Sequence, residues 1–223
     1  MTTFHIVTLF PESIDPYLSA SVIGKARERG TLAVRYYNPR DYQSNSRTRL
    51  DERPFGGGPG MVLRAEPFIR AIDAAKGRKK NVKILFLDRQ GVQFTNTYAR
   101  DLQEQYRHII IIAGRYEGID ARVCDVFADD DVTHVSIGPF ILTGGEIPAL
   151  AIIDCVSRQV PGVLGDPESL EEGRTAGSSV YTRPPSFKYK RRTYSVPDVL
   201  LSGHHGRIEE WKKERNRNTD DVK

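Results

Sequence analysis

The sequence predicts an α/β fold with a mostly parallel sheet, and three observations support this. Apolar runs typical of buried strands alternate with segments of helical periodicity through the first two-thirds of the chain. The strand candidates are apolar on both faces, as strands covered by helices on both sides are. The chain has 223 residues, 39% of them hydrophobic, which is enough for one large domain with a small appendage.

Five apolar runs have the length and composition of strands, and in chain order they are 4–10, 32–38, 81–87, 108–114 and 132–138. Segments with helical spacing fill the intervals, at about 19–30, 66–76, 95–106, 118–127 and 146–160. Gly30 ends the first helical segment, and Pro67 lies in the first turn of the second, where helices tolerate these residues. Between about 38 and 62 the chain is polar and rich in glycine, which indicates a long loop.

The composition of the chain changes after Val160. Residues 161–180 are rich in Gly, Pro, Ser and acidic residues, as linkers are. Residues 181–223 are basic and include one predicted helix at about 205–217. We therefore expect a main domain at 1–160, a linker at 161–180 and a small, mainly helical C-terminal domain at 181–223.

Composition also limits the class of protein. No apolar run approaches the ~20 residues of a membrane helix, and the N-terminus lacks the pattern of a secretion signal. We therefore expect a cytoplasmic protein that makes no use of a membrane. Cys124 and Cys155 lack the spacing of metal ligands, so buried thiols are expected and a metal site is not. The net charge of +4 permits nucleic-acid binding without establishing it.

The stretch RPFGGGPGMV (53–62) invites comparison with phosphate-binding loops. No Gly-Lys-Ser/Thr follows it, so it is not a Walker A loop. No Gly-x-Gly-x-x-Gly stands between a predicted strand and a predicted helix either. Neither common nucleotide motif is therefore present.

Three other glycine-bearing loops directly follow predicted strands, and these are 87–95, 113–120 and 137–150. Ligands of parallel sheets bind beyond the carboxyl ends of the strands, so these loops are expected to converge on one place. Gly114, Gly118, Gly144 and Gly145 would let the backbone approach a ligand closely. A tight turn explains any one of these loops equally well, whereas three loops in register favour a binding site.

Several motifs together resemble one family. GRYEGIDARV, IGPFILTGGEIPALAIIDCVSRQVPGVLG, RPFGGGPGM, VYTRP and LLSGHH are similar to the bacterial tRNA (guanine-N1)-methyltransferases of the SPOUT class. The resemblance extends from residue 1 to about Trp211. It implies a C-terminal trefoil knot, which periodicity does not predict because knots are nearly absent among folds. It also implies a homodimer and S-adenosylmethionine bound by the knot loops.

The resemblance assigns cofactor-binding residues by position. They lie in the three loops that follow the predicted strands, and they are Phe86, Leu87, Gly114, Tyr116, Glu117, Gly118, Ile137, Gly138, Pro139, Phe140, Ile141, Leu142, Gly144, Gly145 and Pro148. Ile137 and Leu142 would pack on the faces of the adenine. The family usually has Ser-Pro where this chain has Asp88 and Arg89.

The reaction that the resemblance implies is methyl transfer to N1 of the guanine at tRNA position 37, next to the anticodon. Neutral guanine carries a proton on N1, so a base must remove it and a cation must stabilise the charge that develops on O6. The family's base is an aspartate, and the matching residue here is Glu168, with Arg158 as the cation. Glu171 and Glu172 lie nearby as substitutes. Without the resemblance, a solvated linker is the more ordinary interpretation of these acids.

The resemblance places RPFGGGPGM at the bound cofactor and the target guanine. Asp51 and Glu52 before it either position the guanine or a magnesium ion, or are simply exposed acids. FKYKRRTY (187–194) interleaves aromatic and cationic residues, as RNA-binding segments do, and the predicted helix at about 205–217 adds four cations between 212 and 217. The expected substrate-binding residues are Asp51, Gly58, Lys188, Arg191, Arg192 and His204.

Two alternatives remain at this point. One is another SPOUT methyltransferase with a different RNA target, and the other is a non-catalytic RNA-binding protein with the same fold. The linker composition also predicts disorder of 161–180 without tRNA and ordering on binding.

Overall fold

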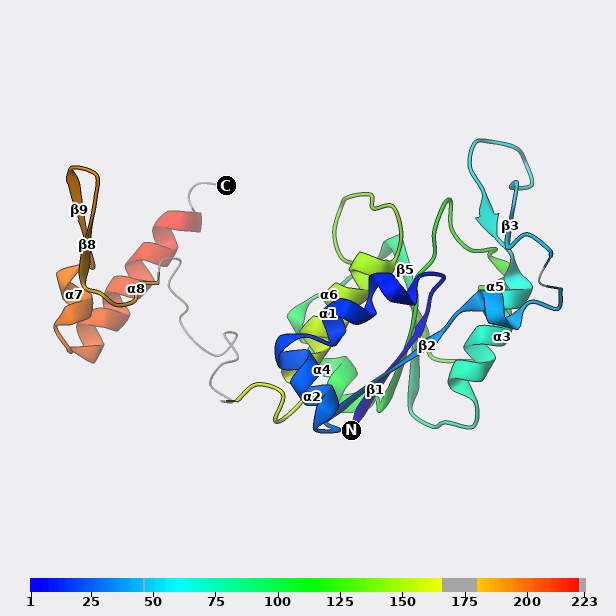
Figure 1. Cartoon of the computed structure of the whole chain (residues 1–223), viewed down its shortest axis with the longest axis horizontal. Coiled ribbons are helices and arrows are strands. Elements are labelled where there is room, and N and C mark those ends of the chain that lie inside the picture. The colour runs from blue at the N-terminus through cyan, green and yellow to red at the C-terminus, as the bar shows by residue number, and fades with distance from the viewer. Residues whose placement is uncertain (46, 166–179, 221–223) are drawn as a thin grey trace. The chain divides into compact units, whose positions relative to one another are not determined.

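The structure is a computed structural model that describes residues 1–45, 47–165 and 180–220, with side chains as far as residue 214. The chain divides into two compact units, Met1–Pro167 and Glu168–Lys223 (Figure 1). The predicted linker falls largely outside the described residues. Among those that are described, no helix has the length and apolar character needed to cross a membrane.

The first unit contains a five-stranded sheet in which every pairing is parallel, with the order β2-β1-β6-β5-β7. The strands are β1 (Thr2–Val7), β2 (Leu32–Tyr37), β5 (Val82–Gln93), β6 (His108–Ile112) and β7 (Val132–Ser136). This confirms the predicted α/β class with a mostly parallel sheet. A short antiparallel pair, β3 (Asp51–Glu52) with β4 (Val62–Leu63), closes the glycine-rich loop.

Helices cover both faces of the sheet (Figure 1). One face carries α1 (Asp15–Leu18), α2 (Ser21–Glu28), α4 (Asn96–Gln105) and α6 (Glu146–Gln159). The opposite face carries α3 (Ala65–Lys76) and α5 (Arg122–Val126). Two 3-10 turns, η1 (Pro11–Ser13) and η2 (Pro39–Tyr42), complete the unit.

The apolar pattern of the strands produces the two cores. Phe4 and Ile109 point to the face of α2, α4 and α6, whereas Val7 and Ile110 point to the face of α3 and α5. All four side chains are fully buried. Alternation along a strand therefore divides a continuous apolar run between two hydrophobic layers, as in sheets buried on both sides.

Local signals account for several helix boundaries. Gly30 follows α2 with a φ of +71°, and the amide of Thr31 donates to the carbonyl of Ala26, as predicted for a glycine stop. The Thr95 hydroxyl accepts a hydrogen bond from the Tyr98 amide at 3.1 Å and thereby caps α4.

Strand β5 continues beyond the predicted end at residue 87, so the expected loop 87–95 is wrong in part. A bulge lies between Leu87 and Val92, and both residues pair with Val135. Gly91 makes the return possible, because a Cβ atom there would lie 2.4 Å from the backbone of His134. The polar residues of the bulge resemble a loop in sequence, although the strand resumes after it.

The described part of the second unit contains a hairpin that the sequence pattern did not predict. Strands β8 (Ser186–Tyr189) and β9 (Arg192–Ser195) pair antiparallel, and Lys190 in the turn has a φ of +57°. The hairpin precedes α7 (Asp198–Leu201) and α8 (His205–Asp220). Phe187 stacks on Tyr194 across the strands with ring centroids 5.5 Å apart.

A buried histidine in β1 makes stability depend on pH. His5 is fully buried, with Nδ1 3.1 Å from the Tyr37 hydroxyl and Nε2 3.3 Å from His108 Nδ1. Burial, and then the charges of Lys79, His108 and Arg35, lower the pKa of His5 to about 3. Burial also lowers the pKa of His108. The folded state therefore resists protonation that the unfolded chain accepts near pH 6.5.

We predict that the free energy of unfolding falls as the pH drops from about 6.5 towards 3. The unfolded state binds a proton at His5 throughout this range and the folded state does not, so the loss reaches ~1.4 kcal/mol per pH unit. Urea denaturation at a series of pH values measures this slope. His5→Gln, which cannot protonate, is expected to flatten it, and an unchanged slope would contradict the assignment.

Candidate active site

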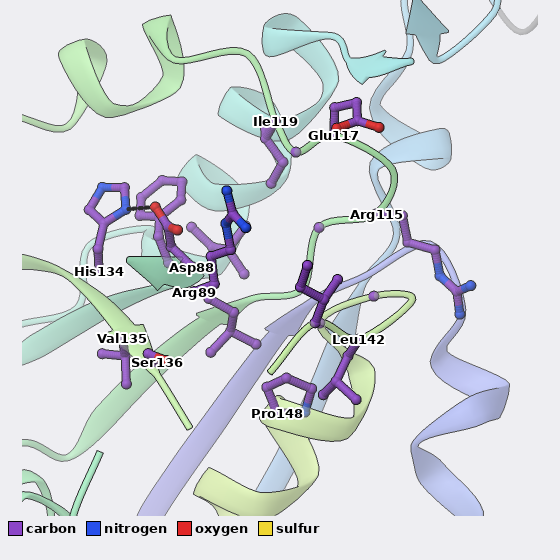
Figure 2. Close-up of a pocket in the computed structure, with 18 of the residues that line it drawn as sticks. Asp88, Arg89, Arg115, Glu117, Ile119, His134, Val135, Ser136, Leu142 and Pro148 are labelled. Atoms are coloured by element: carbon purple, nitrogen blue, oxygen red, sulfur yellow. Dashed lines mark hydrogen bonds and ion pairs between the residues drawn. The ribbon is translucent and has the colours of Figure 1, made fainter. Parts of the chain in front are cut away.

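A cavity of about 580 Å³ opens at the carboxyl ends of β6 and β7 and at the bulge of β5 between them. Its walls are the middle of β5, where the bulge begins, the loop that follows β6 and the segment from β7 to the start of α6 (Figure 2). Small-molecule sites in proteins commonly have volumes of about 300–1,000 Å³. The cavity therefore has the size and the position expected for the ligand site of a parallel sheet.

The loops after β6 and β7 are joined to each other by their backbones. The amide of Gly145 donates to the carbonyl of Gly114 at 2.8 Å, and Arg115 forms an antiparallel bridge with Gly144. A Cβ atom on Gly145 would lie 2.6 Å from Ala113 Cα. Gly145 is thus required by the packing of the two loops, which differs from the expected role of opening space for a ligand.

Glu146, the first residue of α6, is a buried acid behind the cavity wall. Its Oε1 atom accepts hydrogen bonds from Thr8 Oγ1 at 3.3 Å and from Arg115 Nε at 3.2 Å, and its side chain is 6% exposed. Arg115 also lies over the ring of Phe10, with 4.4 Å between its Cζ and the ring centroid. The carboxylate is placed favourably at a helix N-terminus. These contacts link β1 to both loops.

His134 and its partners form a polar wall of the cavity (Figure 2). His134 Nδ1 lies 3.3 Å from Asp88 Oδ2, and Nε2 lies 3.5 Å from Cys124 Sγ. The imidazole stacks on Phe86 with centroids 5.3 Å apart. Burial, followed by the charges of Asp125 and Asp88, raises the pKa of the Cys124 thiol, so the thiol is neutral at pH 7. Cys124 is half-buried and free of any disulfide.

The glycine-rich loop is attached to another wall of the cavity, the loop that follows β6. The amide of Glu117 donates to the carbonyl of Met61 at 3.0 Å, and the amide of Leu63 donates to the carbonyl of Gly118 at 3.0 Å. A Cβ atom on Gly60 would lie 2.4 Å from Glu117 Oε1. The loop between β3 and β4 is therefore anchored at the edge of the cavity.

The structure brings together nearly all residues that the sequence selected for the cofactor. Each of them lines the cavity except Pro139. Asp88, Arg89, Cys124, His134 and Ser136 line it as well, although the motifs did not point to them as ligand contacts. Asp88 and Arg89 stand where the resembled family usually has Ser-Pro, and this difference could have marked them as cavity residues. His134 lies in an ordinary strand sequence that gives no such sign.

The predicted catalytic pair is not brought together in the described residues. Arg158 lies half-buried in the last turn of α6, away from the cavity lining, and makes no ion pair within the described part of the chain. Glu168, Glu171 and Glu172 lie outside the described residues. Asp51 forms a salt bridge with Arg49 at 3.6 Å.

The remaining substrate-binding candidates are exposed. Lys188 lies on β8, Arg191 in the hairpin turn, and Arg192 on β9 with its Cζ 5.4 Å from the Tyr194 ring centroid. His204 lies before α8, and its amide donates to Ser202 Oγ. Gly58 has a φ of +111° in the glycine-rich loop. Within the described ranges, no three His, Cys, Asp or Glu side chains form a group that could hold a metal.

Comparisons with known proteins agree over nearly the whole chain. The family described as tRNA (Guanine-1)-methyltransferase TrmD matches residues 2–223. A tRNA (guanine-N(1)-)-methyltransferase of Carboxydothermus hydrogenoformans is 43% identical over 215 residues, covering 95% of this chain and 81% of the relative. Those of Citrifermentans bemidjiense and Buchnera aphidicola are 41% and 38% identical, and the matches cover 97% and 99% of this chain and 86% and 92% of the relatives.

We predict that Gly145→Ala lowers the free energy of unfolding by about 1–3 kcal/mol, because its Cβ atom would overlap the backbone of Ala113. Gly165→Ala is the matched control, since no atom lies within 4 Å of a Cβ placed there. The control is expected to stay within ~0.5 kcal/mol of the original chain. Urea denaturation of both variants measures the difference, and equal stabilities would contradict the proposed steric constraint.

Proposed function

We propose that this chain, which belongs to the tRNA (guanine-1)-methyltransferase family, transfers a methyl group from S-adenosylmethionine to N1 of a guanine in tRNA. We place the target at position 37, next to the anticodon. The observation that carries the proposal is the agreement between the full-length family match and the cavity at the carboxyl edge of the sheet.

The cavity lining fits S-adenosylmethionine in size and in chemistry. Ile137 and Leu142 offer apolar surface for the adenine, and bare backbone at Gly114 and Gly138 lies beside them. Asp88 and Arg89 carry the two signs of charge that complement the ammonium and carboxylate of a methionine moiety. When bound, this cofactor supplies an electrophilic methyl group carried on a sulfonium.

The fold that we propose with this function is a trefoil knot in the C-terminal part of the first unit. The hydrogen bond from Gly145 to Gly114 supports it, because it places the start of α6 against the loop after β6. Helix α6 then shares the hydrophobic layer of α4, with Ile153 and Leu102 in one core cluster.

The chemistry of the target base determines what the protein must supply. A carboxylate has to accept the N1 proton, and a cation has to stabilise the negative charge that develops on O6. We assign the first role to Glu168 and the second to Arg158. Arg158 lies in the last turn of α6, directly before the segment that carries Glu168, and no described acid forms a salt bridge with it; both facts support this assignment.

RNA binding is assigned to the C-terminal domain, residues 181–223. The hairpin of β8 and β9 presents exposed Lys188, Arg191 and Arg192 beside exposed aromatic rings, a combination suited to phosphates and bases. Because the proposed substrate is tRNA, we also propose that the protein is cytoplasmic. A Mg²⁺ ion would depend on RNA and water for most of its ligands, since the described residues form no three-ligand group.

We further propose that the enzyme is a homodimer in which the linker acid of one subunit reaches the cavity of the other. Apolar side chains exposed near the cavity support a subunit contact there. They are Tyr116, Phe140, Ile141 and Ile147, with 59%, 52%, 80% and 57% of their surface exposed.

Methyl transfer to tRNA is expected only when guanine occupies position 37. Transcripts that carry G or A there are incubated with the protein and S-adenosylmethionine labelled in the methyl group, and incorporation is counted. Equal labelling of both transcripts would favour an RNA methyltransferase with another target. Binding of tRNA without any labelling would favour a non-catalytic RNA-binding protein.

Glu168→Gln is expected to reduce kcat by about 100-fold or more, because the base for the N1 proton is lost. Cofactor affinity, measured by calorimetry, should remain unchanged. Glu171→Gln and Glu172→Gln are the controls for Glu168→Gln. A loss of rate in either one with Glu168→Gln fully active would assign the base elsewhere.

Arg158→Ala should lower kcat more than it weakens tRNA binding, because the guanidinium acts on charge that develops in the transition state.

A further inference from the structure

The ring of Phe55 is the most exposed large hydrophobic side chain of the described residues. It is fully solvent-accessible, with an exposed fraction of 102%. Phenylalanine normally contributes its large apolar surface to a core or to an interface. No described contact holds this ring, so folding of the first unit gains nothing from it and the role of the ring lies outside the core.

The backbone presents Phe55 at the tip of a defined turn. The amide of Gly57 donates to the carbonyl of Pro54 at 3.3 Å, which closes a β-turn with Phe55 and Gly56 at its centre. Gly56 has a φ of +87°, the value that such a turn requires at its third residue and that favours glycine. The turn therefore directs the ring outward from the loop between β3 and β4.

The position of this loop connects Phe55 to the reaction. Both ends of the loop meet in the pairing of Asp51 with Leu63, and its second end is hydrogen-bonded to the cavity wall at Glu117 and Gly118. The loop projects beyond the carboxyl edge of the sheet (Figure 1). A guanine that enters the cavity would therefore bring its neighbouring nucleotides towards this loop.

The surroundings of the ring favour RNA over a protein partner. Arg47, Arg49 and Arg53 are exposed in the same segment, and the Arg49 side chain is 71% exposed despite its pairing with Asp51. Leu50, the nearest large aliphatic residue in sequence, is buried. One aromatic ring among cations, without an apolar patch around it, is the arrangement used to stack a nucleobase beside its phosphates.

We propose that Phe55 stacks on a nucleobase next to the target guanine when the guanine enters the cavity. A base that leaves its stack exposes a face of its neighbour, and the Phe55 ring covers that face. Phe55 is thus a positioning residue for the substrate. This inference rests on the proposed function, and it adds a contact from the catalytic unit to those of the C-terminal hairpin.

The test compares Phe55→Ala, Phe55→Leu and Phe55→Tyr in methyl transfer to tRNA. Loss of one stacking contact is expected to reduce kcat/KM by about tenfold to a hundredfold in the Ala and Leu variants. The Tyr variant, which keeps an aromatic face, should retain the original value. Cofactor affinity and the thermal unfolding midpoint should not change. Val22→Ala, which shortens an exposed side chain on α2, is the matched control.

A second readout reports stacking directly. An anticodon stem-loop with 2-aminopurine beside position 37 is bound to the original chain and to Phe55→Leu. Stacking quenches this fluorophore, so fluorescence should be lower with the phenylalanine than with the leucine. This measurement needs only RNA binding, and it therefore distinguishes failure of the inference from failure of the proposed methyl transfer.

Three results would overturn the inference. Equal kcat/KM for Phe55→Leu and the original chain would remove any role for the aromatic face. Equal fluorescence of the two complexes would place the ring away from the neighbouring base. A change from dimer to monomer in Phe55→Ala, detected by light scattering, would assign the ring to contact with a second copy of the chain.

Discussion

The candidate site depends on one steric constraint, the close approach of two loop backbones at Gly145. The amide of Gly145 reaches the carbonyl of Gly114, and the space that a side chain would need is occupied by Ala113. This approach places the start of α6 beside the end of β6, although β7 lies at the edge of the sheet. The cavity is the space enclosed by the two loops and the bulge of β5, so its shape follows from their packing.

Polar contacts reinforce this arrangement from behind. Glu146 is buried and receives hydrogen bonds from Thr8 and Arg115, so one carboxylate joins the end of β1 to both loops. A buried acid in such a position is stabilised only while its donors remain in place. Arg115, which lines the cavity, extends its guanidinium over the Phe10 ring and is held there by Glu146. The other charged side chains of the cavity lining include Asp88, Arg89 and Glu117.

Sequence patterns were informative where local chemistry determines structure. Runs such as His108–Ile112 identified strands buried on both faces, and the strand ends located the cavity. The continuation of β5 past its bulge was missed, because it depends on contact between Gly91 and the backbone of β7 rather than on a local pattern. Glu146 and Arg115 were missed because they are 31 residues apart and each looks like an ordinary polar residue. The proposed roles of Glu168 and Arg158 rest on family resemblance, since no periodicity identifies a base.

The attachment of the glycine-rich loop to the cavity wall has a thermodynamic consequence. Glu117 and Gly118 bond to the loop through their backbones while they also line the cavity, so the two regions share one set of hydrogen bonds. A molecule that tightens this wall also restricts the loop, and a molecule that orders the loop restricts the wall. Linkage makes such coupling free energies equal in both directions. The first ligand to bind would therefore raise the affinity for the second by the same factor whichever of the two binds first. The rates of the two binding orders need not be equal.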